Sequence, residues 1–219
     1  MTARPVMSRD IAESDHRAFS PPRLTEPLLR RRHLLVTAGA TTAMYLSGAM
    51  FAAGQAAGDA GLWAPISDAA ALAFAASLVP VVTASAHDLG AAGARSAGKV
   101  RAVGLAAAAL VIAGSTFLLA TDLGLVQVEG PLAGAGLAVQ FLGLGAIGAW
   151  LAHTGVLTIR RGLWSRMAGW SAVVAGVGCM AGTVVAALQL FGHPLFLIAY
   201  ALNVGGFGTW LVAMIRRTR

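Results

Sequence analysis

The sequence is poor in cysteine and in charge, and each shortage excludes a class of protein. Cys179 is its only cysteine, so the chain forms no intramolecular disulfide and no metal site built from several cysteines. Only 11% of its residues are charged, whereas a soluble domain typically has about 25%. With 57% of the 219 residues hydrophobic, the composition is typical of a protein that crosses a membrane several times.

Signals of catalysis are missing as well. The sequence has no H-E-x-x-H zinc motif, no phosphate-binding loop and no G-x-S-x-G nucleophile motif. No charged residue falls in the middle of an apolar segment, although such a residue is the usual mark of a proton-coupled carrier or a pump. We therefore expect a protein that is not an enzyme and carries no cofactor.

What the sequence does contain is six long apolar segments. None alternates polar and apolar residues with a period of two, which excludes a β-barrel, so each segment predicts a membrane-spanning helix. The expected fold class is an all-α membrane protein, a six-transmembrane-helix bundle that forms one domain over residues 30–219. Ser67 and Asp68 predict the N-cap of the second helix, and Pro194 predicts the first turn of the sixth. The predicted spans are about 34–54, 70–87, 102–121, 131–153, 168–190 and 195–215.

The basic residues occur on one side of these spans. All 16 fall before the first span or after the second, fourth and sixth. Because basic residues accumulate in cytoplasmic loops, this alternation predicts cytoplasmic N and C termini in the cytoplasmic (inner) membrane of a bacterium. Arg30, Arg31 and Arg32 are expected to bind anionic lipid headgroups. The net charge of +7 is then a property of loops and needs no nucleic-acid partner.

The N-terminal region has two parts. Residues 1–29 mix both charge signs with four prolines and predict a disordered cytoplasmic tail. The following run, Leu34 to Ala53, has 20 residues without a charge and can cross the bilayer. Its preceding arginines also resemble a twin-arginine export signal, with a cleavage region near Gln55. The run is longer than a signal core of about 7–15 residues, and five spans follow it, so we predict that it is retained.

Small and aromatic residues predict how the helices pack. In lipid, glycines let helices approach closely, and we expect the fourth helix to be the most closely packed because it has Gly134, Gly136, Gly143, Gly145 and Gly148. An interfacial aromatic belt is predicted at the cytoplasmic helix ends by Trp150, Trp164, Trp170 and Trp210.

Three polar residues are candidates for a binding site. Tyr45, Gln140 and Asn203 lie nearest the middle of the predicted spans. Gln140 and Asn203 are both about eight or nine residues from the outer face, a depth of roughly 12 Å at about 1.5 Å per residue. Either the three residues line a small polar cavity, or they form interhelical hydrogen bonds that only hold the bundle together.

Two histidines raise the question of a haem. His87 and His153 lie near the cytoplasmic ends of the second and fourth spans. Two histidines at one depth on different helices are the axial ligands of haem in membrane cytochromes b. The third and fifth spans contain no histidine, so we interpret both residues as interfacial and keep a b-type haem protein as a third alternative.

One stretch resembles known proteins. Residues Arg161 to Trp170, RGLWSRMAGW, form a short basic turn with Trp and Gly that leads into the fifth span, and the last span ends in arginine. Over residues 155–219 the chain resembles uncharacterised six-span integral membrane proteins of bacteria. The resemblance implies a shared topology and no activity, because those families have none assigned.

Two functional hypotheses result. The first is a non-enzymatic accessory or structural component that works through contacts with a membrane-protein partner or a second copy of itself. The second is a transporter or channel for a small neutral or weakly polar molecule, with its cavity around Tyr45, Gln140 and Asn203. The second hypothesis requires that those three side chains surround a common space, and the first does not.

Overall fold

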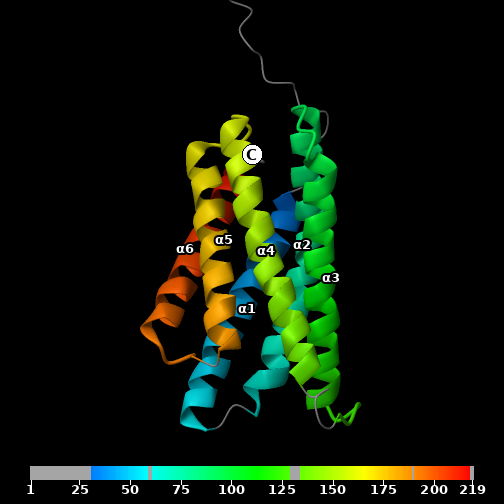
Figure 1. Cartoon of the computed structure of the whole chain (residues 1–219), viewed down its shortest axis with the longest axis vertical. Coiled ribbons are helices and arrows are strands. Elements are labelled where there is room, and N and C mark those ends of the chain that lie inside the picture. Colours follow the sequence, from blue (N-terminus) through cyan, green and yellow to red (C-terminus); the bar gives the residue numbers. More distant parts are fainter. Residues whose placement is uncertain (1–30, 59–60, 129–133, 189, 218–219) are drawn as a thin grey trace, which may run out of the picture.

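The computed structural model describes residues 31–58, 61–128, 134–188 and 190–217, and the tail predicted for residues 1–29 lies outside this part. No strand occurs among the described residues. All six helices are long and apolar enough to cross a membrane, which confirms the prediction of an all-α, six-span protein. The helices are α1 (Arg31–Ala57), α2 (Trp63–Ala91), α3 (Ala97–Asp122), α4 (Ala135–Arg160), α5 (Arg166–Ala187) and α6 (Pro194–Arg217) (Figure 1).

The start of α2 differs from the prediction in a way that affects the site. α2 begins at Trp63, so the predicted N-cap at Ser67 and Asp68 is wrong. Pro65 falls in its first turn, where a proline costs the helix no hydrogen bond. Asp68 consequently lies inside the helix and is only 9% exposed. α6 begins at Pro194, as predicted.

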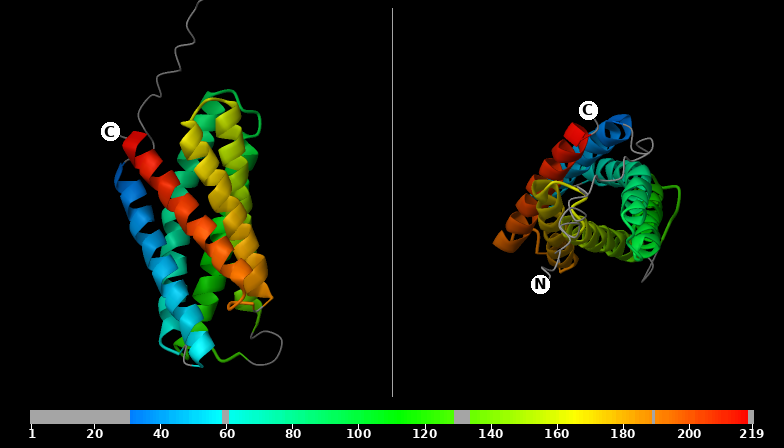
Figure 2. Two further views of the ribbon diagram at one scale, coloured as in Figure 1. Left: turned by 90° about the vertical axis from the view of Figure 1, so that its left-hand side faces the viewer. Right: turned by 90° about the horizontal axis from the view of Figure 1, so that it is seen from above.

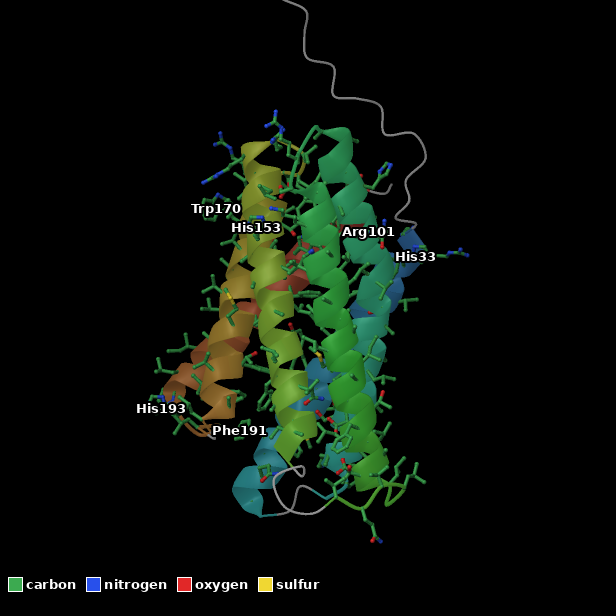
Figure 3. All side chains as sticks on the ribbon, turned by 45° about the vertical axis from the view of Figure 1, so that its right-hand side comes forward. His33, Arg101, His153, Trp170, Phe191 and His193 are labelled. Carbon is green, nitrogen blue, oxygen red and sulfur yellow. The ribbon has the colours of Figure 1, made fainter. Side chains whose placement is uncertain are left out.

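The alternating helix directions give the bundle two chemically different ends. The start of α1, the connections after α2 and α4, and the end of α6 lie at one end (Figure 1). Figure 3 shows Arg101 and His153 in the half nearer this end, and Phe191 and His193 near the opposite one. We call the opposite end, where Asp122 is exposed, the acidic end. The basic end contains the described basic residues Arg31, Arg32, Arg95, Lys99, Arg101, Arg160, Arg161, Arg166, Arg216 and Arg217.

Helices that are consecutive in sequence pack side by side, from α1 against α2 through to α5 against α6. α1 and α6 also touch and close the ring, but their contact is much smaller than that of any consecutive pair. Both views in Figure 2 show α6 tilted across the bundle, so that it approaches α1 near the basic end and diverges from it toward the acidic end. The ring is therefore more open on the acidic side.

Glycines bring α4 close to both of its neighbours. A Cβ atom on Gly143 would lie 2.6 Å from a backbone nitrogen of α3, and one on Gly148 would lie 2.7 Å from a backbone oxygen of α5. At these points only glycine fits, because the two backbones are in contact. The prediction is wrong for Gly134 and Gly145, because a Cβ there would meet nothing within 4 Å at Gly134 and only a methyl group at 3.6 Å at Gly145.

Three of the four tryptophans predicted for the cytoplasmic belt fill the interior of the half nearest the basic end, which we call the packed half. Trp150, Trp164 and Trp210 are 2%, 5% and 0% exposed, and the rings of Trp164 and Trp210 lie 5.9 Å apart. The predicted interfacial belt is wrong for these three, because a position near a helix end fixes the depth of a side chain but not the face it occupies. Trp170, at 58% exposure, does point outward.

Candidate functional site

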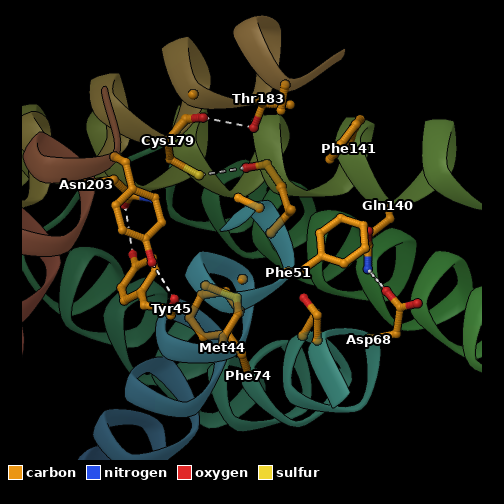
Figure 4. Close-up of a pocket in the computed structure, with 18 of the residues that line it drawn as sticks. Met44, Tyr45, Phe51, Asp68, Phe74, Gln140, Phe141, Cys179, Thr183 and Asn203 are labelled. Carbon is orange, nitrogen blue, oxygen red and sulfur yellow. Dashed lines mark hydrogen bonds between the residues drawn. The ribbon is translucent and has the colours of Figure 1, made fainter. Parts of the chain in front are cut away.

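The other half of the bundle encloses a cavity of about 480 Å³, and all six helices contribute to its lining (Figure 4). Its walls are mostly apolar, and two groups of polar side chains lie on opposite sides of it. We call one group the tyrosine pole, formed by Tyr45, Tyr200 and Asn203. We call the other the carboxylate pole, formed by Asp68, Asp122 and Gln140.

The tyrosine pole joins α1 to α6. The Tyr45 hydroxyl donates a hydrogen bond of 2.9 Å to Oδ1 of Asn203, and the Tyr200 hydroxyl donates to the backbone oxygen of Tyr45. The two tyrosine rings meet edge to face with their centroids 5.7 Å apart. Since the whole contact between α1 and α6 is small, these two hydrogen bonds are a substantial part of what closes the ring.

The carboxylate pole joins α2, α3 and α4. Nε2 of Gln140 donates to Oδ1 of Asp68 and to Oγ of Ser115, both at 2.9 Å. Gln140 is 7% exposed and Ser115 is fully buried, so these bonds form away from the surface. Asp122, at the end of α3, is close enough for its carboxyl group to interact with that of Asp68. The pole therefore combines two acids and one amide.

The apolar walls are rich in aromatic rings, contributed by Phe51, Phe74, Phe141, Phe191, Phe196 and Phe207. Cys179 of α5 also lines the cavity. Its thiol donates to the backbone oxygen of Leu144 at 3.3 Å, and the hydroxyl of Thr183 donates to the Cys179 backbone oxygen at 2.8 Å. Because the chain has no other cysteine, this thiol is a natural reporter of the cavity.

The cavity is closed toward the basic end and reaches the surface toward the acidic end. Phe74 and Phe207 meet at its inner limit with ring centroids 5.7 Å apart, and Phe207 packs on Trp210 at 5.2 Å. At the other limit the lining includes Gln55 and Asp122, both of which are exposed. Access is therefore from the acidic end.

The structure places all three candidate residues in this lining: Tyr45, Gln140 and Asn203. Tyr45 and Asn203 bond to each other, whereas Gln140 lies at the opposite pole and bonds to Asp68. Gln140 and Asn203 therefore do not contact each other, although the sequence places them at a similar depth. The two alternatives, a cavity lining and interhelical hydrogen bonds, are therefore both present, since each side chain bonds to another helix and also faces the cavity.

Sequence reasoning missed Asp68, because the polar residues before the second apolar run were assigned to a cap. A usable signal was present one turn earlier. Trp63 is a typical interfacial anchor and Pro65 a typical first-turn residue, and together they indicate a helix that starts before Asp68. Asp68 lies five residues after Trp63, about 7.5 Å into the helix at about 1.5 Å per residue.

The two histidines considered for haem do not belong to this cavity. His87 and His153 are both exposed, and neither contributes to the lining. Axial ligation of one haem needs both imidazoles to face a common space, and these two lie on the outer surfaces of α2 and α4. The described residues also contain no group of three or more histidine, cysteine, aspartate or glutamate side chains placed to hold a metal ion.

Comparison with known proteins adds no assignment. No protein-family model, curated protein or solved structure matches the chain. The chemistry of the cavity is therefore the basis for a functional interpretation.

Proposed function

We propose that this chain is a transporter of the bacterial cytoplasmic membrane, oriented with its basic end in the cytoplasm, that binds a small and largely apolar molecule in its cavity. The observation that supports this most is a single cavity of about 480 Å³ lined by all six helices. That volume is in the range of small-molecule sites, about 300–1,000 Å³. Its two poles supply the few polar groups that fix the orientation of a ligand.

A transporter fits the cavity better than a channel does. A channel needs a continuous path, but side chains fill the packed half between the cavity and the basic end. Leu78, Val81 and Trp210 are 0% exposed there. A carrier instead holds its ligand in a site open to one side at a time, and this cavity opens toward the acidic end.

The first hypothesis from the sequence, an accessory component that works through helix contacts, has weaker support. Gly205 and Gly208 of α6 are exposed, and a Cβ on either would meet nothing within 4 Å. Such open small residues suit contact with another helix, but they specify no partner. The cavity, by contrast, specifies a size and a chemistry.

Modification of Cys179 tests whether the cavity is an accessible site. The neutral reagent methyl methanethiosulfonate should modify Cys179 in the purified protein, followed by intact mass. Gly48 lines the cavity one turn closer to the acidic end than Tyr45, and its Cβ position is open. Gly48→Phe should therefore slow the modification without a clash.

Gly39→Phe is the matched control, because Gly39 lies on the same helix, is exposed, and has equal room for a side chain. This variant should react like the parent protein. Equal rates in the parent and Gly48→Phe would overturn the proposal. Compounds that slow the modification of Cys179 should then be transported by counterflow in proteoliposomes. If they are not, the protein binds these compounds but does not transport them.

The orientation is tested separately. A green fluorescent protein fused after Arg219 should fluoresce in a bacterial host, because the basic end is proposed to be cytoplasmic. An alkaline phosphatase fused at the same place should be inactive. The opposite pair of results would invert the topology.

A further inference from the structure

The carboxylate pole has negative charge without a matching positive charge. Asp68 is 9% exposed, and among the described residues of the cavity lining there is no lysine, arginine or histidine. The ion pair that the structure records, Arg217 with Asp88 at 3.9 Å, lies at the basic end. A buried carboxylate in a membrane protein is costly unless it has a partner, so this pole is suited to a positive charge from outside.

Gln140 fixes the carboxylate and adds no positive charge of its own. Its amide nitrogen is used by Asp68 and Ser115, so the pole presents oxygen atoms to the cavity. Asp122 adds a second carboxyl group on the exposed side, where it interacts with Asp68. Oxygen acceptors with negative charge attract a cation, preferably one that carries N–H or polarised C–H groups.

The rest of the cavity selects the kind of cation. The described residues contain no group of three metal-ligating side chains, and a space of about 480 Å³ is far too large for a bare ion. Its aromatic rings instead suit an organic cation. Phe51 and Phe141 lie on the same side of the cavity as Gln140 (Figure 4), and ring faces attract ammonium groups within about 6 Å. On the opposite side Tyr45, Tyr200 and Phe196 form a continuous series of rings, with centroids 5.7 and 6.0 Å apart, which suits an apolar body.

We propose that the ligand of this cavity is a small organic cation, an amine or quaternary ammonium ion with an apolar body. Its charge pairs with Asp68 and its body lies against the aromatic walls. The inference rests on the proposed function and adds the charge of the ligand to it. It also assigns Asp68, which no apolar pattern in the sequence marks, as the residue that determines this specificity.

The charge preference is measurable at Cys179 in the full-length protein. The cationic reagent trimethylammonioethyl methanethiosulfonate and the anionic sulfonatoethyl methanethiosulfonate are compared, each rate divided by its rate with a free thiol in solution. The corrected ratio should favour the cation by about tenfold or more, as expected for a cleft with one sign of charge. Asp68→Asn should bring the ratio close to one, whereas Asp68→Glu should keep it.

Asp88→Asn is the control for a general change in charge, because Asp88 lies at the basic end away from the cavity. It should leave the ratio unchanged. A ratio near one in the parent protein, or a ratio that Asp68→Asn does not alter, would overturn the inference. The proposed function is tested independently by the neutral reagent. If Gly48→Phe slows modification by that reagent, the cavity is accessible whatever the charge of its ligand.

Competition gives a second readout that does not depend on the charged reagents. Choline and its neutral carbon isostere dimethylbutanol are added during modification of Cys179 by the neutral reagent. Choline should protect the thiol at a concentration several-fold lower than dimethylbutanol, by about fivefold or more, the low end of the aromatic-plus-carboxylate attraction. Equal protection by both compounds would contradict a cation site and keep a site for neutral molecules.

Discussion

The two halves of this bundle are made by the same six helices, but one is solid and the other is hollow. In the packed half the largest side chains face inward, with Trp150, Phe207 and Trp210 at 2%, 1% and 0% exposure. In the cavity half, the lining includes small residues with open space in front of them, such as Gly48 of α1, where a Cβ would meet nothing within 4 Å. α6 also diverges from α1 there (Figure 2). Small inward residues and diverging helices together leave the space open.

The halves also differ in how their buried polar groups are satisfied. Among the described residues, the indole nitrogens of Trp150 and Trp210 are buried without a hydrogen-bond partner, and both belong to the packed half. Tyr45, Gln140 and Asn203 in the cavity half form specific bonds. The comparison indicates that packing stabilises the first half, whereas the second half uses directed hydrogen bonds at its poles and leaves its centre available.

The largest expected effect is loss of an inward ring from the packed half. Trp210→Ala should lower the free energy of unfolding by about 3 kcal/mol, since large-to-small changes in a core leave a void. The measurement is unfolding of the purified protein in a denaturing detergent titration, followed by helical circular dichroism. Trp170→Ala, at a position 58% exposed, should change stability by less than about 0.5 kcal/mol. Similar losses in both variants would contradict the division into halves.

A smaller effect is expected where α6 crosses α5. A Cβ on Gly206 would lie 2.6 Å from the backbone nitrogen of Ala175, whereas one on Gly205 would meet nothing within 4 Å. Gly206→Ala should destabilise the protein by about 2 kcal/mol through overpacking. Gly205→Ala should be neutral or slightly stabilising, because alanine favours a helix. The same titration compares these neighbours, and an equal response would show that the contact between the helices is looser than described.

At the carboxylate pole we expect a smaller loss of stability and an energetic coupling between Gln140 and Asp68. Gln140→Leu removes the bonds to Asp68 and Ser115 and should cost about 1 kcal/mol, in the range for polar contacts between membrane helices. The double variant Gln140→Leu/Asp68→Leu should cost less than the sum of the two single changes, because neither buried polar group is then left alone. Strict additivity in this double-mutant cycle would mean that the two side chains act independently.

The smallest effect is expected at the ion pair of the basic end. Arg217 and Asp88 are 3.9 Å apart and their side chains are 37% and 22% exposed. Arg217→Gln should cost no more than about 0.5 kcal/mol, as for other surface ion pairs. The difference from the parent protein should shrink further as salt is added. A loss that persists at high salt would indicate that this pair is buried more effectively than its exposure implies.

The number and order of the helices could be predicted from the sequence, because each span is a separate apolar run. The faces of the helices could not be predicted, since alanine and glycine occur on every side and leave no distinct apolar stripe. Trp164 and Trp170 illustrate this limit: they are six residues apart, yet one is 5% and the other 58% exposed. Tertiary packing alone decides which of them turns inward.

The candidate site was predictable only in part. Tyr45, Gln140 and Asn203 stand out because polar residues are rare in apolar spans, and all three line the cavity. Asp68 was hidden by its position beside a loop, where an acid usually caps a helix. Its role depends on Gln140, which is 72 residues away in sequence. No local pattern encodes a contact of that kind.

The closure of the ring by α1 and α6 has a consequence for how the protein is made. Because synthesis runs from the N-terminus, α1 is made before α4 and α4 before α6. The partner of Asp68, Gln140, is present once α4 has been made, but the partner of Tyr45, Asn203, is present only once α6 has been made. A nascent chain that stops before α6 therefore has its carboxylate pole but no enclosed cavity.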